Sequence, residues 1–257
     1  MKYLLLLSLL ALFQTTDRRK LVWSDEFDKA GKPDDTRWGY DIGTSENGWG
    51  NNELEYYTSD PGNVRVENGM LVIEAIKEPK EGMNYTSARI VSKNKGDWTY
   101  GRIEVRAKLP KGRGTWPAIW MLPTEWKYGG WPESGEIDIM EHVGFDPGVV
   151  HATMHSGKYN HTINTQKEGK VTVADCMDNF HVYAVDWSKD KIDCYVDDKL
   201  YHTVKRDPND DFMGWPFDQK FHLIMNIAVG GGWGGQKGVD ESIWPQKMEV
   251  DYVRVYQ

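Results

Sequence analysis

The segment SGEIDIMEHVG, residues 134–144, places three carboxylates close together among hydrophobic side chains. Glycoside hydrolysis uses such groups, because one carboxylic acid protonates the leaving oxygen and a second carboxylate acts as nucleophile or base. A third acid between them raises the pKa of its neighbours through like charge, which helps to keep one of them protonated. Glu136, Asp138 and Glu141 are therefore candidate catalytic residues for cleaving a glycosidic bond.

The spacing of these acids poses a question about the backbone. In a regular strand alternate side chains share a face, so Glu136 and Asp138 lie together while Glu141 points into the core beside Ile139. A β-bulge at or near Met140 would return Glu141 to the face of the other two acids. A strand that ends at Met140 would instead leave Glu141 in a solvated loop. The alternation by itself leaves both interpretations open.

A metal site is the rival use of these acids and of the histidines in EHVG and HATMH. Zinc sites favour an H-E-x-x-H motif or cysteine-rich spacing, and the sequence contains neither. We therefore expect catalysis to need no cofactor.

Strand patterns are frequent in the chain, whereas helical periodicity is scarce. The predicted strands lie within residues 63–78, 102–110, 180–204, 220–231 and 248–257. Asn68-Gly69 separates two alternating runs and is a strong hairpin signal. The Gly- and Pro-rich segments 109–117 and 230–238 are typical of loops.

Many strands without intervening helices predict an all-β fold, a sandwich or a barrel. A jelly roll of two curved antiparallel sheets fits the length of the chain, and one bent sheet can form a concave substrate groove. No repeat or low-complexity linker divides residues 17–257, so we expect a single catalytic domain there.

The composition indicates a carbohydrate partner more than a nucleic acid. The net charge of −8 argues against a nucleic-acid partner, which would favour a basic patch. The chain has 12 Trp and 13 Tyr but only 7 Phe, and rings with polar tips suit wet binding surfaces. Sugars present C–H faces that stack on such rings.

Residues 1–16 predict a secretory signal peptide, with a buried N-terminal helix as the alternative. Lys2 precedes an apolar run over residues 3–13, which is shorter than the ~20 residues that span a bilayer as a helix. We therefore expect an exported monomer without a membrane span. Export permits a disulfide between Cys176 and Cys194, although we favour two buried thiols.

The segment GEIDIMEHVG resembles the signature of glycoside hydrolase family 16 in its bulged E-x-D-x-x-E form. That form is typical of laminarinase-like β-1,3-glucanases and related mixed-linkage glucanases. The shorter E-x-D-x-E form marks lichenases and xyloglucan transglycosylases. The similarity continues through LVWSDEFD, GWGNNELEYYT, YTSARIVSK, GRGTWPAIWMLP, HATMHSG, FHVYAVDW, NIAVGGGWGG and MEVDYVRVYQ. This resemblance favours the bulge over a strand end.

The resemblance also implies a role for each acid. Glu136 matches the nucleophile, Glu141 the general acid/base, and Asp138 the assisting acid that hydrogen-bonds the nucleophile. The family retains anomeric configuration. Glu136 would attack the anomeric carbon while Glu141 protonates the leaving oxygen, and water activated by Glu141 would then release the glycosyl-enzyme.

Seven further positions are candidates for binding the substrate. Five resemble residues that line the groove of the family: Trp116, His155, Arg89, Asn51 and Trp233. Trp120 shares a strand face with Trp116, and Trp131 lies in a Gly/Pro loop five residues before Glu136. Each has an ordinary structural alternative, since a Trp in a strand is commonly core and a lone His is commonly only packed. Glu53 and His151 are weaker candidates, and the direction of His142 depends on the bulge.

Many members of the family bind one calcium ion on the convex face, away from the acids. The matching positions are Glu26, the carbonyl of Gly69, and Asp251. Oxygen ligands from distant segments suit calcium, and the ion would be structural. A plain salt-bridged surface is the alternative.

The favoured function is a retaining endo-β-glucanase acting on β-1,3-glucan or mixed-linkage β-1,3-1,4-glucan. An endo-hydrolase of marine galactans, similar to agarases, porphyranases or carrageenases, is the first alternative. A non-catalytic, lectin-like carbohydrate-binding module would need the groove but not three aligned acids. A transglycosylase would show high acceptor transfer and little hydrolysis.

Overall fold

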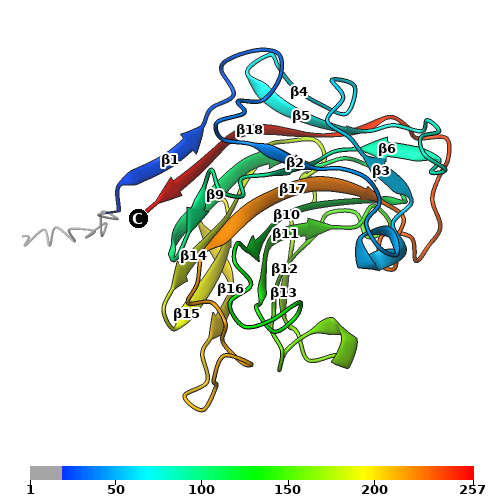
Figure 1. Cartoon of the computed structure of the whole chain (residues 1–257). Coiled ribbons are helices and arrows are strands. Elements are labelled where there is room, and N and C mark those ends of the chain that lie inside the picture. Colours follow the sequence, from blue (N-terminus) through cyan, green and yellow to red (C-terminus); the bar gives the residue numbers. More distant parts are fainter. Residues whose placement is uncertain (1–18) are drawn as a thin grey trace, which may run out of the picture.

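The computed structural model describes residues 19–257, so the predicted signal peptide lies outside the described residues. Two large antiparallel sheets of eight strands each curve over one another, and a two-stranded sheet lies beside them (Figure 1). The predicted all-β jelly roll is confirmed. Among residues 19–257, no helix combines the length and hydrophobicity needed to cross a membrane.

The first large sheet, called the outer sheet, has the strand order β16-β15-β14-β9-β18-β5-β4, and β1 pairs with β18 at its side. Its strands are β1 (Leu21–Asp25), β4 (Val64–Glu67), β5 (Met70–Ala75), β9 (Gly101–Lys108), β14 (His181–Ser188), β15 (Lys191–Val196), β16 (Lys199–Lys205) and β18 (Gln246–Tyr256). The first and last strands of the described chain therefore lie side by side (Figure 1).

The second large sheet, called the groove sheet, has the order β13-β12-β11-β10-β17-β7-β2, and β8 pairs with β17. Its strands are β2 (Gly39–Asp41), β7 (Arg89–Val91), β8 (Asp97–Trp98), β10 (Thr115–Pro123), β11 (Glu136–His142), β12 (Val149–His155), β13 (Lys167–Thr172) and β17 (Phe221–Val229). The three acids lie on β11, inside this sheet.

The remaining elements are short and flank the groove sheet. The parallel pair consists of β3 (Glu55–Tyr57) and β6 (Tyr85–Ser87). Two short turns, the irregular η1 (Gly48–Asn52) and the 3-10 turn η2 (His161–Ile163), interrupt the loops. Each of these turns carries residues that reach the groove.

The core lies between the two large sheets and follows from the alternation in the sequence. In β9, Ile103, Val105 and Ala107 are buried while the charged residues between them are only partly covered. Burying such side chains is the dominant favourable term in folding, at ~25 cal/mol per Å² of apolar surface. Every residue of β17 is buried, because this strand faces the core on one side and the floor of the groove on the other.

The predicted hairpin at Asn68-Gly69 is confirmed. β4 and β5 pair antiparallel around these two residues, whose φ angles are 54° and 74°. A two-residue turn with positive φ at both positions matches the twist of the strands it joins. Cys176 and Cys194 are both buried and free, as expected for two thiols.

Candidate active site

A β-bulge in β11 decides where Glu141 points. Along β12, Asp138 pairs with Thr153 and Glu141 pairs with His151. Three steps along β11 therefore match two steps along β12, so β11 holds one extra residue between the two acids. Ile139 and Met140, the two residues between these acids, lie in the hydrophobic core. The predicted bulge at or near Met140 is confirmed.

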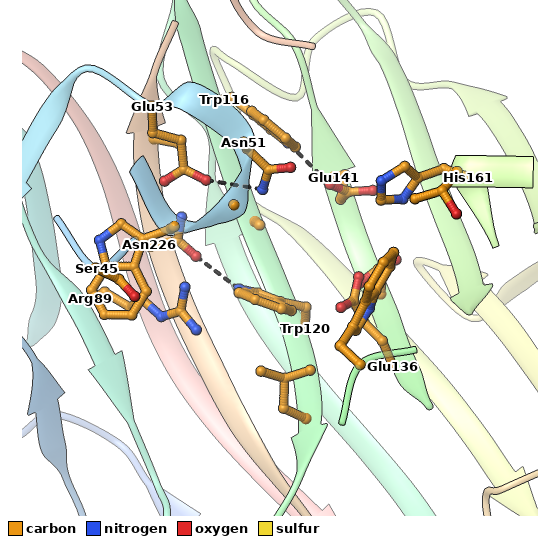
Figure 2. Close-up of a pocket in the computed structure, with 18 of the residues that line it drawn as sticks. Ser45, Asn51, Glu53, Arg89, Trp116, Trp120, Glu136, Glu141, His161 and Asn226 are labelled. Atoms are coloured by element: carbon orange, nitrogen blue, oxygen red, sulfur yellow. Dashed lines mark hydrogen bonds between the residues drawn. The ribbon is translucent and has the colours of Figure 1, made fainter. Parts of the chain in front are cut away.

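As a result, all three acids line one groove over the groove sheet. Glu136 and Glu141 point into it in Figure 2. Glu136 and Glu141 are partly exposed, whereas Asp138 is 2% exposed. His155, the register partner of Glu136 on β12, reaches the same cluster. Its Nε2 lies 3.3 Å from Oδ2 of Asp138 and 3.7 Å from Oε1 of Glu136. The sequence-predicted acids and histidine thus form one cluster.

Burial raises the pKa of all three carboxyl groups. For Glu136 it does so to about 8, with repulsion from Asp138 as the next cause and the charge of His155 opposing both. For Asp138, burial and then the charge of Glu141 raise the pKa well above its usual range. For Glu141, burial also raises the pKa, and a hydrogen bond from Trp116 opposes this. Such a cluster holds protons near neutral pH and is suited to acid catalysis.

Trp116 is the direct partner of Glu141. Its Nε1 donates to Oε1 of Glu141 over 3.0 Å (Figure 2). The ring of Trp233 packs edge-on against Trp116, with 5.6 Å between ring centroids, and against His151, with 5.0 Å. Both predicted tryptophans therefore line the groove beside the general acid candidate.

The groove has two arms that meet at Glu136 and Glu141. The β7 arm extends over β10, β17 and β7, and its walls include Trp49, Asn51, Arg89, Trp120, Trp126 and Asn226. The β13 arm extends over β12 and β13, and its walls include His151, Thr153, His155, Gln166, Glu168 and Trp233. A groove open on both sides of the acids suits an inner unit of a polymer.

Arg89 is fixed in the β7 arm between two aromatic rings. Its guanidinium carbon lies 4.3 Å from the ring centroid of Trp49 and 4.7 Å from that of Trp120. Nε donates to Asp41 over 3.0 Å. Cation–π contacts hold the planar group still, and its free donors suit paired hydroxyls.

A chain of hydrogen bonds fixes the polar side of the same arm. Trp120 Nε1 donates to Asn226 Oδ1 over 2.8 Å, and Asn226 Nδ2 donates to the Tyr57 hydroxyl over 3.0 Å. Tyr57 in turn donates to Glu53 over 3.1 Å, and Asn51 donates to the other oxygen of Glu53 over 3.2 Å. Glu53 thus orients Asn51, which lies at the junction of the two arms.

On the opposite wall, Trp131 lies in a cluster with two histidines. Its ring centroid is 6.0 Å from that of His155 and 5.0 Å from that of His161. His161 begins η2, and the Asn160 side chain caps this turn by accepting from the Thr162 amide over 3.1 Å. His161 therefore borders both arms next to the acids (Figure 2).

The comparison with known proteins assigns the family. A family model described as "Glycosyl hydrolases family 16" matches residues 51–254, which include every element of the groove sheet except β2. This chain belongs to glycosyl hydrolase family 16. It is accordingly a glycoside hydrolase, and catalysis in this family needs no cofactor.

Three relatives show how close the similarity is. A "Beta-glucanase" of Rhodothermus marinus is 57% identical over 245 residues, which cover 93% of this chain and 85% of the relative. The X-ray structure of the laminarinase from Rhodothermus marinus matches with a TM-score of 0.91 and 55% identity, covering 93% of this chain and 97% of the other. SCLam, described as a non-specific endo-β-1,3(4)-glucanase from family GH16, matches with a TM-score of 0.88 and 50% identity, covering 93% and 91%.

Several groove residues of this family 16 chain are not predicted from the sequence. Asn226 is a polar residue within the apolar run of β17, which is a signal that it faces a groove. Trp49 lies in GWGNNELEYYT, where its φ of 55° places it in an irregular turn. Such a turn has no periodicity from which the direction of a side chain could be predicted. His161 and Glu168 lie in polar segments without any local signal.

His142 faces away from the acids, is fully buried, and accepts from the Gly148 amide over 3.2 Å.

The three residues expected to bind calcium do not present a free set of oxygen ligands. Glu26 accepts two hydrogen bonds from Arg254, over 3.0 and 2.8 Å. Asp251 accepts from Arg106 over 2.6 Å, and Gly69 lies in the β4–β5 turn. In this arrangement each of the two carboxylates is paired with an arginine.

Proposed function

We propose that this family 16 enzyme is a retaining endo-β-glucanase that hydrolyses β-1,3-glucans and mixed-linkage β-1,3-1,4-glucans. The observation that carries the proposal is the bulge in β11, which brings Glu136, Asp138 and Glu141 to one face of an open groove. The names of the similar proteins, a β-glucanase, a laminarinase and a non-specific endo-β-1,3(4)-glucanase, support this substrate class.

In the proposed reaction Glu136 attacks the anomeric carbon of the bound glucosyl unit. Glu141 protonates the departing glycosidic oxygen at the same time, and the bond to the leaving chain breaks. Glu141, now ionised, takes a proton from water, which attacks the anomeric carbon and releases Glu136. Two displacements at one carbon retain its configuration, as expected for a carboxylate nucleophile paired with an acid/base.

The burial of the acids explains which of them carries a proton. Asp138 is the most deeply buried, so its ionised form is the least favourable. The repulsion that raises the pKa of Glu136 comes from an ionised Asp138, and it vanishes once Asp138 is protonated. The negative charge therefore falls on the more exposed Glu136, next to His155, while Glu141 keeps its proton for the leaving oxygen.

Replacing the nucleophile tests the assignment. Glu136→Ala should abolish release of reducing sugar from laminarin while leaving the far-UV and near-UV circular dichroism spectra of the wild type. Glu125→Ala, which removes an exposed acid outside the cluster, is the matched control and should retain wild-type turnover. Near-normal turnover by Glu136→Ala would contradict the mechanism.

The substrate class is tested by product analysis on laminarin, barley β-glucan, lichenan and agarose, side by side. The proposal expects oligosaccharides of intermediate length early in the reaction on the glucans. Products from agarose alone would instead support a galactan hydrolase. Binding without products would support a carbohydrate-binding module, and transfer to added acceptors with little hydrolysis would support a transglycosylase.

We further propose that residues 1–16 direct export and that the enzyme acts as a monomer. The apolar run after Lys2 supports the first point. Mass spectrometry of enzyme secreted by its own cells should show a chain that begins beyond residue 16. Light scattering should give one chain per particle, and a dimer mass would contradict the second point.

A structural calcium ion is a separate proposal that rests on the resemblance at Glu26, Gly69 and Asp251. Binding would require the two carboxylates to leave Arg254 and Arg106. Melting temperatures in excess calcium and in a chelator test it. A higher value in calcium, abolished in Asp251→Asn, supports the ion, whereas equal values overturn the proposal.

A further inference from the structure

The β13 arm contains a histidine–carboxylate hydrogen bond that the proposed mechanism does not use. Nδ1 of His151, on β12, lies 2.5 Å from Oε1 of Glu168, on β13. His151 is the register partner of Glu141, so the imidazole lies one strand away from the general acid candidate. The two partners differ in exposure, with 9% for the His151 side chain and 37% for that of Glu168.

The contact with Glu168 fixes which nitrogen of His151 faces the groove. A carboxylate only accepts, so Nδ1 carries the hydrogen that is donated to Glu168. The other nitrogen, Nε2, is buried in the β13 arm without a hydrogen-bond partner among the described residues. Leaving a buried polar group unpaired is unfavourable, so this atom is poised for a ligand or water.

A second unpaired group lies in the same arm. Oε1 of Gln166 is buried and has no hydrogen-bond partner within residues 19–257. Gln166 precedes β13 and lines the arm together with Trp233, whose ring contacts His151. The arm therefore offers a ring nitrogen, an amide oxygen and an aromatic side chain. This is the combination that a pyranose ring with its hydroxyls and C–H faces requires.

We propose that His151, held by Glu168, forms with Gln166 and Trp233 a subsite that binds one glucosyl unit of the substrate in the β13 arm. This inference rests on the proposed glucanase function and extends it to a defined place in the groove. His151 Nε2 hydrogen-bonds one sugar hydroxyl, Gln166 Oε1 accepts from another, and Trp233 contacts the ring. Glu168 is a positioning residue, because it acts only through the imidazole.

Binding to a catalytically blocked enzyme tests the subsite without requiring turnover. The background is Glu136→Ala, and the probe is laminarihexaose, titrated by calorimetry. Adding His151→Ala should weaken binding about tenfold, which is ~1.4 kcal/mol, because the sugar loses one hydrogen bond. Adding Glu168→Gln should weaken binding by a smaller factor, since the imidazole stays and the glutamine oxygen still accepts from Nδ1 but carries no charge.

Lys170→Gln is the matched control, because Lys170 is an exposed residue of β13 and the register partner of His151. This variant should bind like the background. Equal affinities for the His151→Ala, Glu168→Gln and Lys170→Gln proteins would overturn the subsite. Absence of any hexaose binding by the Glu136→Ala protein would overturn it too, while hydrolysis by the wild type would still decide the proposed function.

A kinetic measurement separates binding from an effect through Glu141. In the otherwise wild-type enzyme, His151→Ala should raise KM for laminarihexaose and leave kcat nearly unchanged, as expected for a contact made equally in ground and transition states. A fall in kcat at constant KM would mean that His151 acts through the general acid, and it would overturn the subsite. Glu168→Gln keeps the test available if His151→Ala does not fold.

Discussion

Trp116 donates the hydrogen of its Nε1 to Oε1 of Glu141 over 3.0 Å. The bond stabilises the ionised form of the acid and so opposes the rise in pKa that burial causes. A general acid must hold its proton until the leaving oxygen needs it. The indole therefore limits how far burial can raise the pKa of Glu141.

Removing this hydrogen bond should move the alkaline limb of the pH profile. In Trp116→Phe the ionised form of Glu141 loses its donor, so the pKa rises and the acid stays protonated to higher pH. We expect the alkaline limb of kcat/KM on laminarin to shift upward by about one pH unit. Trp120→Phe is the control, because Trp120 donates to Asn226 instead and its loss should leave the limb in place.

The stability of the enzyme should fall as the pH rises from about 4.5 to about 8. Burial raises the pKa of all three acids in the folded chain, that of Glu136 to about 8 from its ordinary 4.5, so unfolding releases protons that the cluster retains in this interval. The resulting stabilisation is complete below pH 4.5 and is lost as the pH passes 8. Glu136→Gln cannot titrate, so its free energy of unfolding in urea should vary less with pH. An equal slope for both proteins would contradict the prediction.

Arg89→Lys should weaken binding in the β7 arm. Lysine keeps the charge but loses the planar group that lies between Trp49 and Trp120. We expect KM for laminarin to rise roughly tenfold with a smaller change in kcat. Arg106→Lys changes an arginine of the outer sheet that lies over Phe180, and it should leave both constants unchanged.

The two cysteines should be unreactive in the folded enzyme. Cys176 and Cys194 are fully buried, and burial raises the pKa of Cys176 to about 11, so little thiolate forms at neutral pH. A chromogenic disulfide reagent should detect no thiol in native protein and both thiols in denaturant without reductant. Finding no thiol in denaturant would show that they are bridged.

Much of the fold follows from local patterns, because alternation and turn chemistry act over a few residues. The strand β9 and the hairpin at Asn68-Gly69 are examples in which the sequence pattern and the structure agree. Alternation alone does not predict the position of Glu141, because the same residue pattern fits both a bulge and a strand end. Only the resemblance to family 16 favoured the bulge.

A groove residue can be predicted when it lies in a recognisable motif. It cannot be predicted when it lies in a distant segment without one. Arg89, Trp116 and Asn51 lie in segments that resemble the family, and all three line the groove. Glu168 reaches the site because β13 pairs with β12, and His161 reaches it through a loop. Such neighbours are set by strand order, which a short polar segment does not encode.

The extra residue in β11 also bears on how this strand tolerates a change of length. Deleting one residue between Asp138 and Glu141 restores simple alternation, so both acids would still project from the same side of the sheet. The separation along the strand would stay near two steps, because the bulge already fits three steps of β11 to two steps of β12. What would change is the number of side chains given to the core. Met140 is fully buried, so the longer form adds hydrophobic contact beneath the acids. Insertion and deletion at this point thus change the core beneath the catalytic pair while keeping its direction and nearly its spacing.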